Sequence, residues 1–241
     1  MWSLARLHFP VITSKSSLRH PHKAMTPVRR WRYDDFVDTT LMPLIDGPVE
    51  TIAIAPARKR WTRAQCEALD ASGLLAGEHL ELIDGELINK MGKNQPHVIA
   101  VAMISAWLRE IFGYAHVLQE APIAVSSLDN VSNEPEPDII VVTKELGAYQ
   151  SNCPTPSDLL LVIEVSDSTV YLDLKTKASL YARAGIADFW VLDVNARRLI
   201  VHRNPNEGEY TAIHVYREQE PVSPLAAPQA EFRAQYAFPP K

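Results

Sequence analysis

The sequence predicts an α/β domain in which a mixed central β-sheet is flanked by helices. Residues 139–142 and 159–165 are short, continuous apolar runs, as expected for strands that are buried on both faces. Residues 173–185 have the character of a helix, and residues 187–194 form another strand-like run. The order is therefore strand, strand, helix, strand, which is typical of a sheet covered by helices.

The 241 residues are 46% hydrophobic and 22% charged, which suits one main domain with appendages. No apolar run approaches the roughly 18 uncharged residues that a membrane span needs, so no membrane association is expected. Cys66 and Cys153 lack the spacing of a zinc site or a disulfide framework, which favours free thiols in the cytoplasm. A net charge of −5 argues against a large non-specific nucleic-acid surface but allows a local basic stripe.

Two parts of the chain are expected, an irregular extension over residues 1–60 and a folded domain over residues 61–241. Residues 1–33 carry seven Lys or Arg and no Asp or Glu. Such an arm could contact phosphates, resemble a transit peptide or have no essential role, and Met25 is an alternative start. Within the rest of the extension, one short strand is expected at 51–55.

The first elements of the domain carry clear local signals. Thr62 and Gln65 have the spacing of a capping box, which predicts a helix start at this point. Residues 79–88 alternate on both sides of Asp84-Gly85, the dipeptide preferred for a two-residue hairpin turn. Residues 97–113 have apolar side chains at helical spacing and end on a glycine.

The remaining strands are expected at both ends of the central unit. Residues 114–119 and 122–126 precede it, and residues 197–203 and 207–218 follow it, with a loop at 205–208. The tail from residue 221 onward contains five prolines and no recognisable chemistry.

Two carboxylates stand where a buried strand should carry only hydrocarbon. Asp138 opens the run 139–142, and Glu164 lies near the end of the run 159–165. A buried, unpaired carboxylate costs several kcal/mol, and two at neighbouring strand ends repel each other unless a cation lies between them. Mg²⁺ prefers such hard oxygen ligands. The alternative is that both carboxylates are structural caps or hydrogen-bond partners.

Three further side chains could join this site or be plain surface residues. Lys177 lies four residues after Asp173, so the two either form an exposed pair or the lysine faces the carboxylates. Glu86 stands just past the hairpin turn, where a solvated role is the alternative. His97 begins a helix, where it could cap the helix, contact a phosphate or be solvated.

The assembled motifs resemble the Uma family of restriction endonucleases, a branch of the PD-(D/E)XK nuclease superfamily. The matching text is ELIDGELI, PEPDIIVV, LLLVIEVSDST, DLKTKASLYARAGIADFWVLD and RLIVHR, over about residues 61–203. The resemblance implies a restriction-endonuclease-like fold. It also implies that Asp138, Glu164 and Glu86 are catalytic metal ligands.

The superfamily's simplest pattern has a lysine two residues after the second acid, but Ser166 occupies that position here. In the Uma-like pattern the lysine moves to the following helix, where Lys177 aligns best and Lys175 is the alternative. The implied function is an endonuclease that uses Mg²⁺, or Mn²⁺, to hydrolyse DNA through a metal-activated water. A homodimer would be the simplest way to cut both strands.

Two rival functions stay open at this point. One is an inactive nucleic-acid-binding or regulatory module on the same fold, which lysines turned away from the carboxylates would favour. The other is a metal-dependent phosphodiesterase that acts on RNA or on a small nucleotide.

Overall fold

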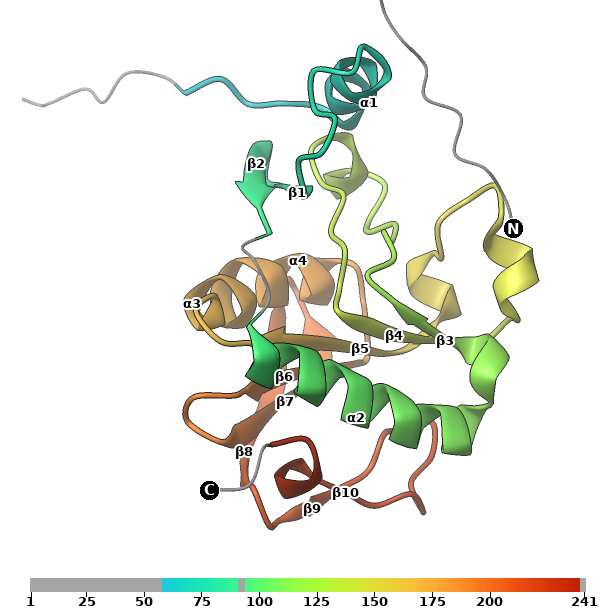
Figure 1. The fold of residues 1–241 in the computed structure, drawn as a ribbon, viewed down its shortest axis with the longest axis vertical. Helices are drawn as coiled ribbons and strands as arrows, with labels where there is room; N and C mark the ends of the chain where they lie inside the picture. The colour runs from blue at the N-terminus through green and yellow to red at the C-terminus, as the bar shows by residue number, and fades with distance from the viewer. Residues whose placement is uncertain (1–57, 91–93, 239–241) are drawn as a thin grey trace, which may run out of the picture. The chain divides into compact units, whose positions relative to one another are not determined.

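The computed structural model describes residues 58–90 and 94–238 (Figure 1). The predicted extension and its strand at 51–55 fall on or before residue 60, almost wholly outside these ranges, and stay predictions. All of the structure that follows belongs to the unit Pro56–Lys241.

The centre of this unit is a mixed six-stranded sheet in the order β3-β4-β5-β6-β7-β8. The strands β5 and β6 run parallel, and every other neighbouring pair is antiparallel. The bounds are Val117–Gln119 (β3), Ile139–Val142 (β4), Leu159–Ser166 (β5), Asp188–Asp193 (β6), Arg198–Asn206 (β7) and Glu209–Arg217 (β8). The mixed α/β fold predicted from the sequence is confirmed.

Helices cover both faces of this sheet (Figure 1). On one face lies α2, Gln95–Phe112, which Asn94 caps at its start and Gly113 ends. The other face carries a helical segment made of α3 (Val170–Leu172), a π-helical turn (Asp173–Lys177) and α4 (Ala178–Arg183). The three layers explain why β4, β5 and β6 are apolar along their length.

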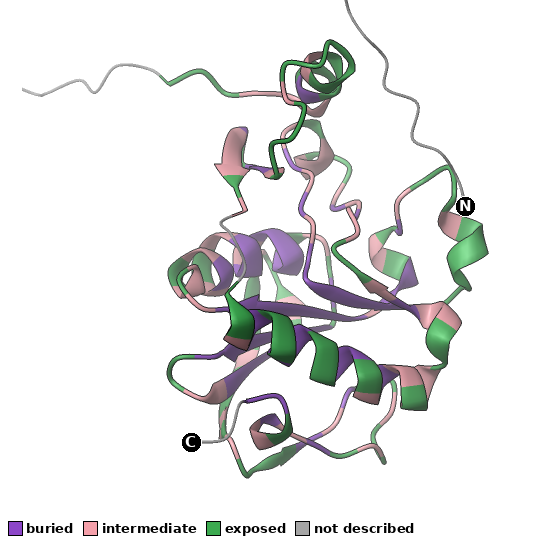
Figure 2. Ribbon diagram, viewed as in Figure 1, coloured by how far each residue is buried: buried purple, intermediate pink, exposed green. Residues whose placement is uncertain are grey.

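Alternate side chains of the central strands enter two separate cores. Ile139 and Ile163 pack with α2, whereas Ile140 and Val162 pack with α4. Figure 2 shows these strands as buried, with the outer face of α2 exposed. By the same alternation, Glu164 belongs to the α4 face of β5.

A separate hairpin, β1 (Leu80–Ile83) and β2 (Glu86–Asn89), precedes the sheet. Its two turn residues, Asp84 and Gly85, have φ values of 48° and 75°, as the predicted turn requires. The helix α1, Arg63–Ala71, precedes the hairpin and begins with the predicted Thr62 capping box. Both local predictions are therefore confirmed.

The connections differ from the prediction in three places. Residues 122–126 form no strand, because Ile123 and Ala124 donate to the carbonyls of Pro135 and Pro154 in neighbouring loops. Residues 114–116 form a 3₁₀ turn before β3, and β7 extends to Asn206, which leaves a two-residue turn where a longer loop was expected. The other 3₁₀ turns are Asp129–Val131, Leu146–Tyr149, Pro156–Asp158 and Ala234–Tyr236.

The C-terminal part adds the short hairpin of β9 (Pro221–Val222) and β10 (Phe232–Arg233), and joins the core on the α2 side. The ring of Phe232 lies 4.7 Å from that of Trp107 on α2. Among the described residues, no helix combines the length and apolar character needed to cross a membrane. Cys66 and Cys153 are both free thiols.

Candidate functional site

The register of β4 and β5 brings the two predicted carboxylates together. Ile139 pairs with Ile163, and extending this antiparallel register by one residue sets Asp138 opposite Glu164. The Val165 amide, next to Glu164, donates a 2.8 Å hydrogen bond to Asp138 Oδ2. Like charges directly opposite each other destabilise a sheet, so this arrangement needs compensating positive charge.

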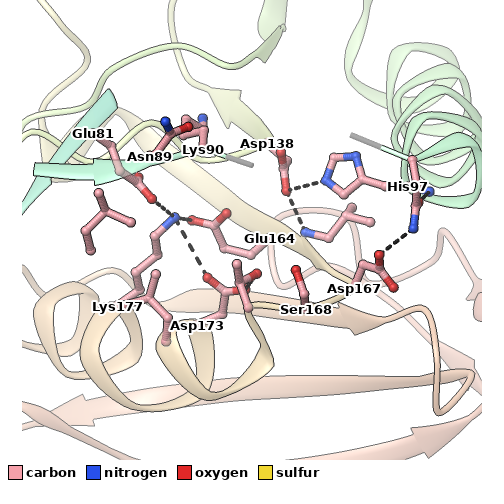
Figure 3. A pocket seen from close by; sticks show the side chains of 15 residues that line it. Glu81, Asn89, Lys90, His97, Asp138, Glu164, Asp167, Ser168, Asp173 and Lys177 are labelled. Atoms are coloured by element: carbon pink, nitrogen blue, oxygen red, sulfur yellow. Dashed lines mark hydrogen bonds and ion pairs between the residues drawn. The ribbon is translucent and has the colours of Figure 1, made fainter. Parts of the chain in front are cut away.

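Lys177 supplies positive charge from the helical layer (Figure 3). Its Nζ lies 3.0 Å from Glu81 Oε1, 3.1 Å from Glu164 Oε1 and 3.8 Å from Asp173 Oδ1. The lysine is only 3% exposed. The alternative in which Lys177 and Asp173 form an exposed surface pair is therefore wrong.

The π-helical turn aims both Asp173 and Lys177 at the end of β5. Asp173 Oδ2 accepts hydrogen bonds from the hydroxyls of Ser166 and Thr169. Ser166, which stands where the superfamily's simplest pattern has lysine, is thus engaged with the helix that carries Lys177. Single π-helical turns occur frequently at functional sites.

These side chains line one pocket of about 90 Å³. Its lining residues are Glu81, Ile88, Asn89, Lys90, Asn94, His97, Asp138, Glu164, Val165, Asp167, Ser168, Thr169, Leu172, Asp173 and Lys177. In Figure 3 the carboxylates of Glu81, Glu164 and Asp173 converge on the Lys177 amine, while Asp138 faces His97. The hairpin, two sheet strands, α2 and the π-helical turn therefore meet at one place.

Burial and mutual repulsion set the protonation of the two central groups. Burial raises the pKa of Glu164 to about 8; Lys177 opposes the rise, and the charges of Asp173, Asp138 and Glu81 add to it. Burial alone would lower the pKa of Lys177, but the carboxylates of Glu164, Glu81 and Asp173 raise it well above its ordinary value. The two pKa shifts are consistent with each other. Several carboxylates together stabilise the charge of one lysine, but one lysine cannot neutralise several carboxylates. Lys177 stays charged, and the carboxylates remain short of positive charge.

His97 completes the surroundings of Asp138. Its Nε2 lies 3.3 Å from Asp138 Oδ2, and the imidazole is buried. Although burial acts in the opposite direction, His97 and the Val165 amide lower the pKa of Asp138. This role could not be predicted from the sequence, because it depends on how the start of α2 packs against the start of β4.

The structure does not bring Glu86 to this pocket. Its carboxylate lies 3.1 Å from Arg60 Nη1, and its side chain is 43% exposed. Glu81, five residues earlier on the same hairpin, is buried and points at Lys177 instead. Of the two candidate lysines, Lys177 lines the pocket, whereas Lys175 is exposed and lines a different cavity beside β8. Glu81 therefore replaces Glu86 in the candidate set.

The donor atoms fit a hard divalent cation in their chemistry, since buried carboxylate oxygens dominate the pocket. The described residues nevertheless contain no group of three or more His, Cys, Asp or Glu already arranged to hold a metal ion. Lys177 Nζ contacts two of the carboxylates, Glu81 and Glu164. A cation at this pocket would therefore share Glu81 and Glu164 with the lysine.

A crystal structure from Anabaena variabilis, described as a putative nuclease belonging to DUF820, has a TM-score of 0.51 and 15% identity. The likeness covers 66% of this chain and 89% of that one, and shows a shared fold. The comparison with curated proteins gave no match. Residues 64–235 match the family described as "Uma2: Putative restriction endonuclease", and the chain belongs to this family.

Proposed function

We propose that this protein is an endonuclease that depends on a divalent cation and hydrolyses phosphodiester bonds in DNA. The observation that carries the proposal is the position of Lys177, buried between Glu164 and Glu81 in the pocket that also holds Asp138. Strongly perturbed ionisable groups gathered in one pocket are typical of catalytic sites. Membership of the Uma2 family supports the nuclease class.

Asp138 and Glu164 are the side chains that would hold Mg²⁺ or Mn²⁺, with Glu81 in place of the Glu86 expected from the sequence. When bound, such a cation polarises the scissile phosphate and acidifies the attacking water. His97 and the Val165 amide fix one oxygen of Asp138 in advance. The protein thus orients this ligand before any substrate arrives.

Lys177 has a role of its own in the proposed reaction. Three carboxylates hold its proton on Nζ, so the group acts as a fixed positive charge and not as a base. A preorganised, buried charge stabilises the negative charge that develops on the phosphate in the transition state. Tyr181, which donates a 2.8 Å hydrogen bond to Glu164 Oε1, helps to fix the carboxylate that positions the lysine.

Two observations bear on the rival functions. An inactive binding module was expected to turn its lysines away from the carboxylates, whereas Lys177 faces them. An enzyme for a small nucleotide should enclose its substrate, and ligand pockets of that kind span roughly 300–1,000 Å³. The pocket formed by the described residues is about 90 Å³, which is too small to enclose a nucleotide.

The test is cleavage of supercoiled plasmid, single-stranded DNA and single-stranded RNA with Mg²⁺ or Mn²⁺. We expect cutting of DNA by the wild type, and loss of cutting in Asp138→Asn and Glu164→Gln. The matched control is Lys175→Met, which should cut normally, with circular dichroism confirming that every variant is folded. Activity that survives in both carboxylate variants, or cutting of RNA alone, would overturn the proposal.

A further inference from the structure

Asp167 is a pocket carboxylate with amide donors on both of its oxygens. It directly follows β5, and in Figure 3 it lies on the His97 side of the pocket, away from Lys177. Its Oδ2 accepts from Asn94 Nδ2, and its Oδ1 accepts from Asn195 Nδ2 at 2.8 Å. Asn195 Nδ2 also donates to the backbone carbonyl of Asp167 at 2.7 Å. The contacts of this carboxylate therefore join separate segments of the fold.

The three joined segments meet at one end of the sheet. Asn94 begins α2, Asp167 follows β5, and Asn195 follows β6, which runs parallel to β5. All three side chains are exposed or half-buried. Hydrogen bonds that water can replace contribute little to stability. The main consequence of this network is therefore where it holds the start of α2.

Asn94 carries the contact on to His97. Its Nδ2 donates to Asp167, while its Oδ1 accepts from the His97 amide at 3.0 Å and so caps α2. The His97 imidazole contacts Asp138 through Nε2, and within the described residues its buried Nδ1 has no hydrogen-bond partner. The ring is therefore held by one side-chain contact and by the helix start that carries it. A shift of that helix start would move Nε2 relative to Asp138.

We propose that Asp167 is a positioning residue that acts on Asp138 through the start of α2. Its carboxylate anchors Asn94 to the ends of β5 and β6, and the first turn of α2 then sets the imidazole that contacts Asp138. The importance of this network rests on the proposed function, in which Asp138 holds the cation. Outer hydrogen-bond partners that orient a metal ligand tune both cation affinity and activity.

The test exchanges the two groups of the contact between Asn94 and Asp167. Asn94→Asp keeps an acceptor for the helix cap but sets two carboxylates against each other. The double variant Asn94→Asp, Asp167→Asn restores one donor and one acceptor, and leaves an acceptor for Asn195. The readout is the nitrogen chemical shifts of the His97 imidazole, measured by NMR in metal-free protein at alkaline pH and identified by their loss in His97→Gln. The wild type should show one neutral tautomer with its proton on Nε2, Asn94→Asp should show a mixture, and the double variant should restore the wild-type signals.

Thr62→Ala is the control for a purely structural effect, because it removes the cap of α1, a helix that contributes no residue to the pocket lining. It should lower the denaturation midpoint in urea and leave the His97 signals unchanged, whereas Asn94→Asp should do the reverse. Asn94→Ser keeps a cap but lacks the amide that reaches Asp167, and gives the same reading if Asn94→Asp does not fold. His97 signals that stay unchanged in these variants, or that the double variant fails to restore, would overturn the proposal.

Cleavage assays give the functional reading. Asn94→Asp should lower kcat about threefold to fivefold with KM unchanged, because Asn94 lies one step further from Asp138 than a direct partner, whose loss lowers activity about tenfold or more. In a His97→Leu background the same change should have no further effect, since the network acts through the imidazole. An additive loss in that background would contradict the proposal. A wild type that cuts no DNA would refute the proposed function alone, and the imidazole signals would still decide whether Asp167 positions the ring.

Discussion

Asp188 and Glu164 are buried carboxylates on the neighbouring strands β6 and β5, with exposures of 1% and 3%. Asp188 has donors on both of its oxygens. Trp190 Nε1 and Arg203 Nε bind Oδ1 at 2.9 and 2.8 Å, and Arg203 Nη2 and the Leu225 amide bind Oδ2 at 3.4 and 2.8 Å. This set ties β7 and the C-terminal segment to the sheet, so its role is structural.

Glu164, in contrast, has too few donors for its charge. Its Oε1 accepts from Lys177 and Tyr181, but Glu81 and Asp173 compete for the same lysine. Burial therefore does not distinguish a structural carboxylate from a functional one. The number of hydrogen-bond donors for each carboxylate distinguishes them, because a buried carboxylate that lacks donors is stabilised when a cation or a proton binds to it.

The largest effect should come from removing the shared lysine. In metal-free protein, Lys177→Met leaves three buried carboxylates without their cation and should lower the free energy of unfolding by about 3–5 kcal/mol. The exposed neighbour provides the control, and Lys175→Met should change it by less than about 0.5 kcal/mol. Urea denaturation of both variants with a chelator measures the difference. Equal losses would mean that the pocket charges are not coupled as described.

A pair of isosteric variants tests the comparison itself. Asp188→Asn turns an acceptor into a donor that faces other donors, and should cost about 1–3 kcal/mol of stability without changing cation affinity. Glu164→Gln keeps an acceptor for Tyr181 and Lys177, and should cost less stability while abolishing cation binding. Denaturation and calorimetric titration with Mn²⁺ give the two readings. If both variants lose mainly stability, or both lose cation binding, the distinction between a structural Asp188 and a functional Glu164 is wrong.

The pH dependence of stability tests the protonation of Glu164. The pKa of Glu164 is raised from 4.5 to about 8 in the folded state, so the folded protein binds an extra proton between these values. That contribution is complete below pH 4.5 and is lost as the pH rises through about 8. The wild type should therefore lose stability relative to Glu164→Gln over this range in chelator. A difference that stays constant with pH would contradict the assignment.

The two hairpin glutamates offer a smaller contrast. Glu81→Gln removes a carboxylate 3.0 Å from Lys177 Nζ and should lower kcat about tenfold to a hundredfold. Glu86→Gln removes only an exposed pair with Arg60 and should leave kcat within about twofold. Steady-state cleavage assays distinguish them. A larger loss of kcat in Glu86→Gln than in Glu81→Gln would show that Glu86 belongs to the site.

The smallest effect should come from His97, which positions Asp138. Leucine at this position should lower kcat about tenfold, and glutamine should recover most of the loss, because its amide can donate to Asp138 Oδ2 in place of Nε2. Cation affinity should fall in parallel with kcat across the two variants. If the leucine variant is as active as the glutamine variant, the imidazole only fills space.

Local chemistry explains which parts of this site could be predicted from the sequence. The hairpin follows from Asp84-Gly85, whose backbone preference needs no distant partner. Asp138 and Glu164 could be recognised because the first opens an apolar run and the second lies near the end of another. The spacing of Asp173 and Lys177 put both on one face of a helix, but could not say that this face is buried against β5.

The choice between Glu81 and Glu86 shows where sequence reasoning ends. The register pairs Ile83 with Glu86 and Glu81 with Ile88, so both glutamates project from the same face of the hairpin. They differ only in distance from the turn. Glu86 lies beside the turn with Arg60, whereas Glu81 lies at the far end, close to Lys177. Only the long-range packing of the hairpin against the helical segment decides which one enters the pocket.

The most direct test of the central claim is calorimetric titration of the folded, metal-free protein with Mn²⁺. The wild type should bind one or two ions per chain with release of protons, because Glu164 must lose its proton to act as a ligand. Asp138→Asn and Glu164→Gln should lose this binding, while Asp188→Asn should retain it. Equal binding by all four proteins, or none by the wild type, would contradict a cation site built on these carboxylates.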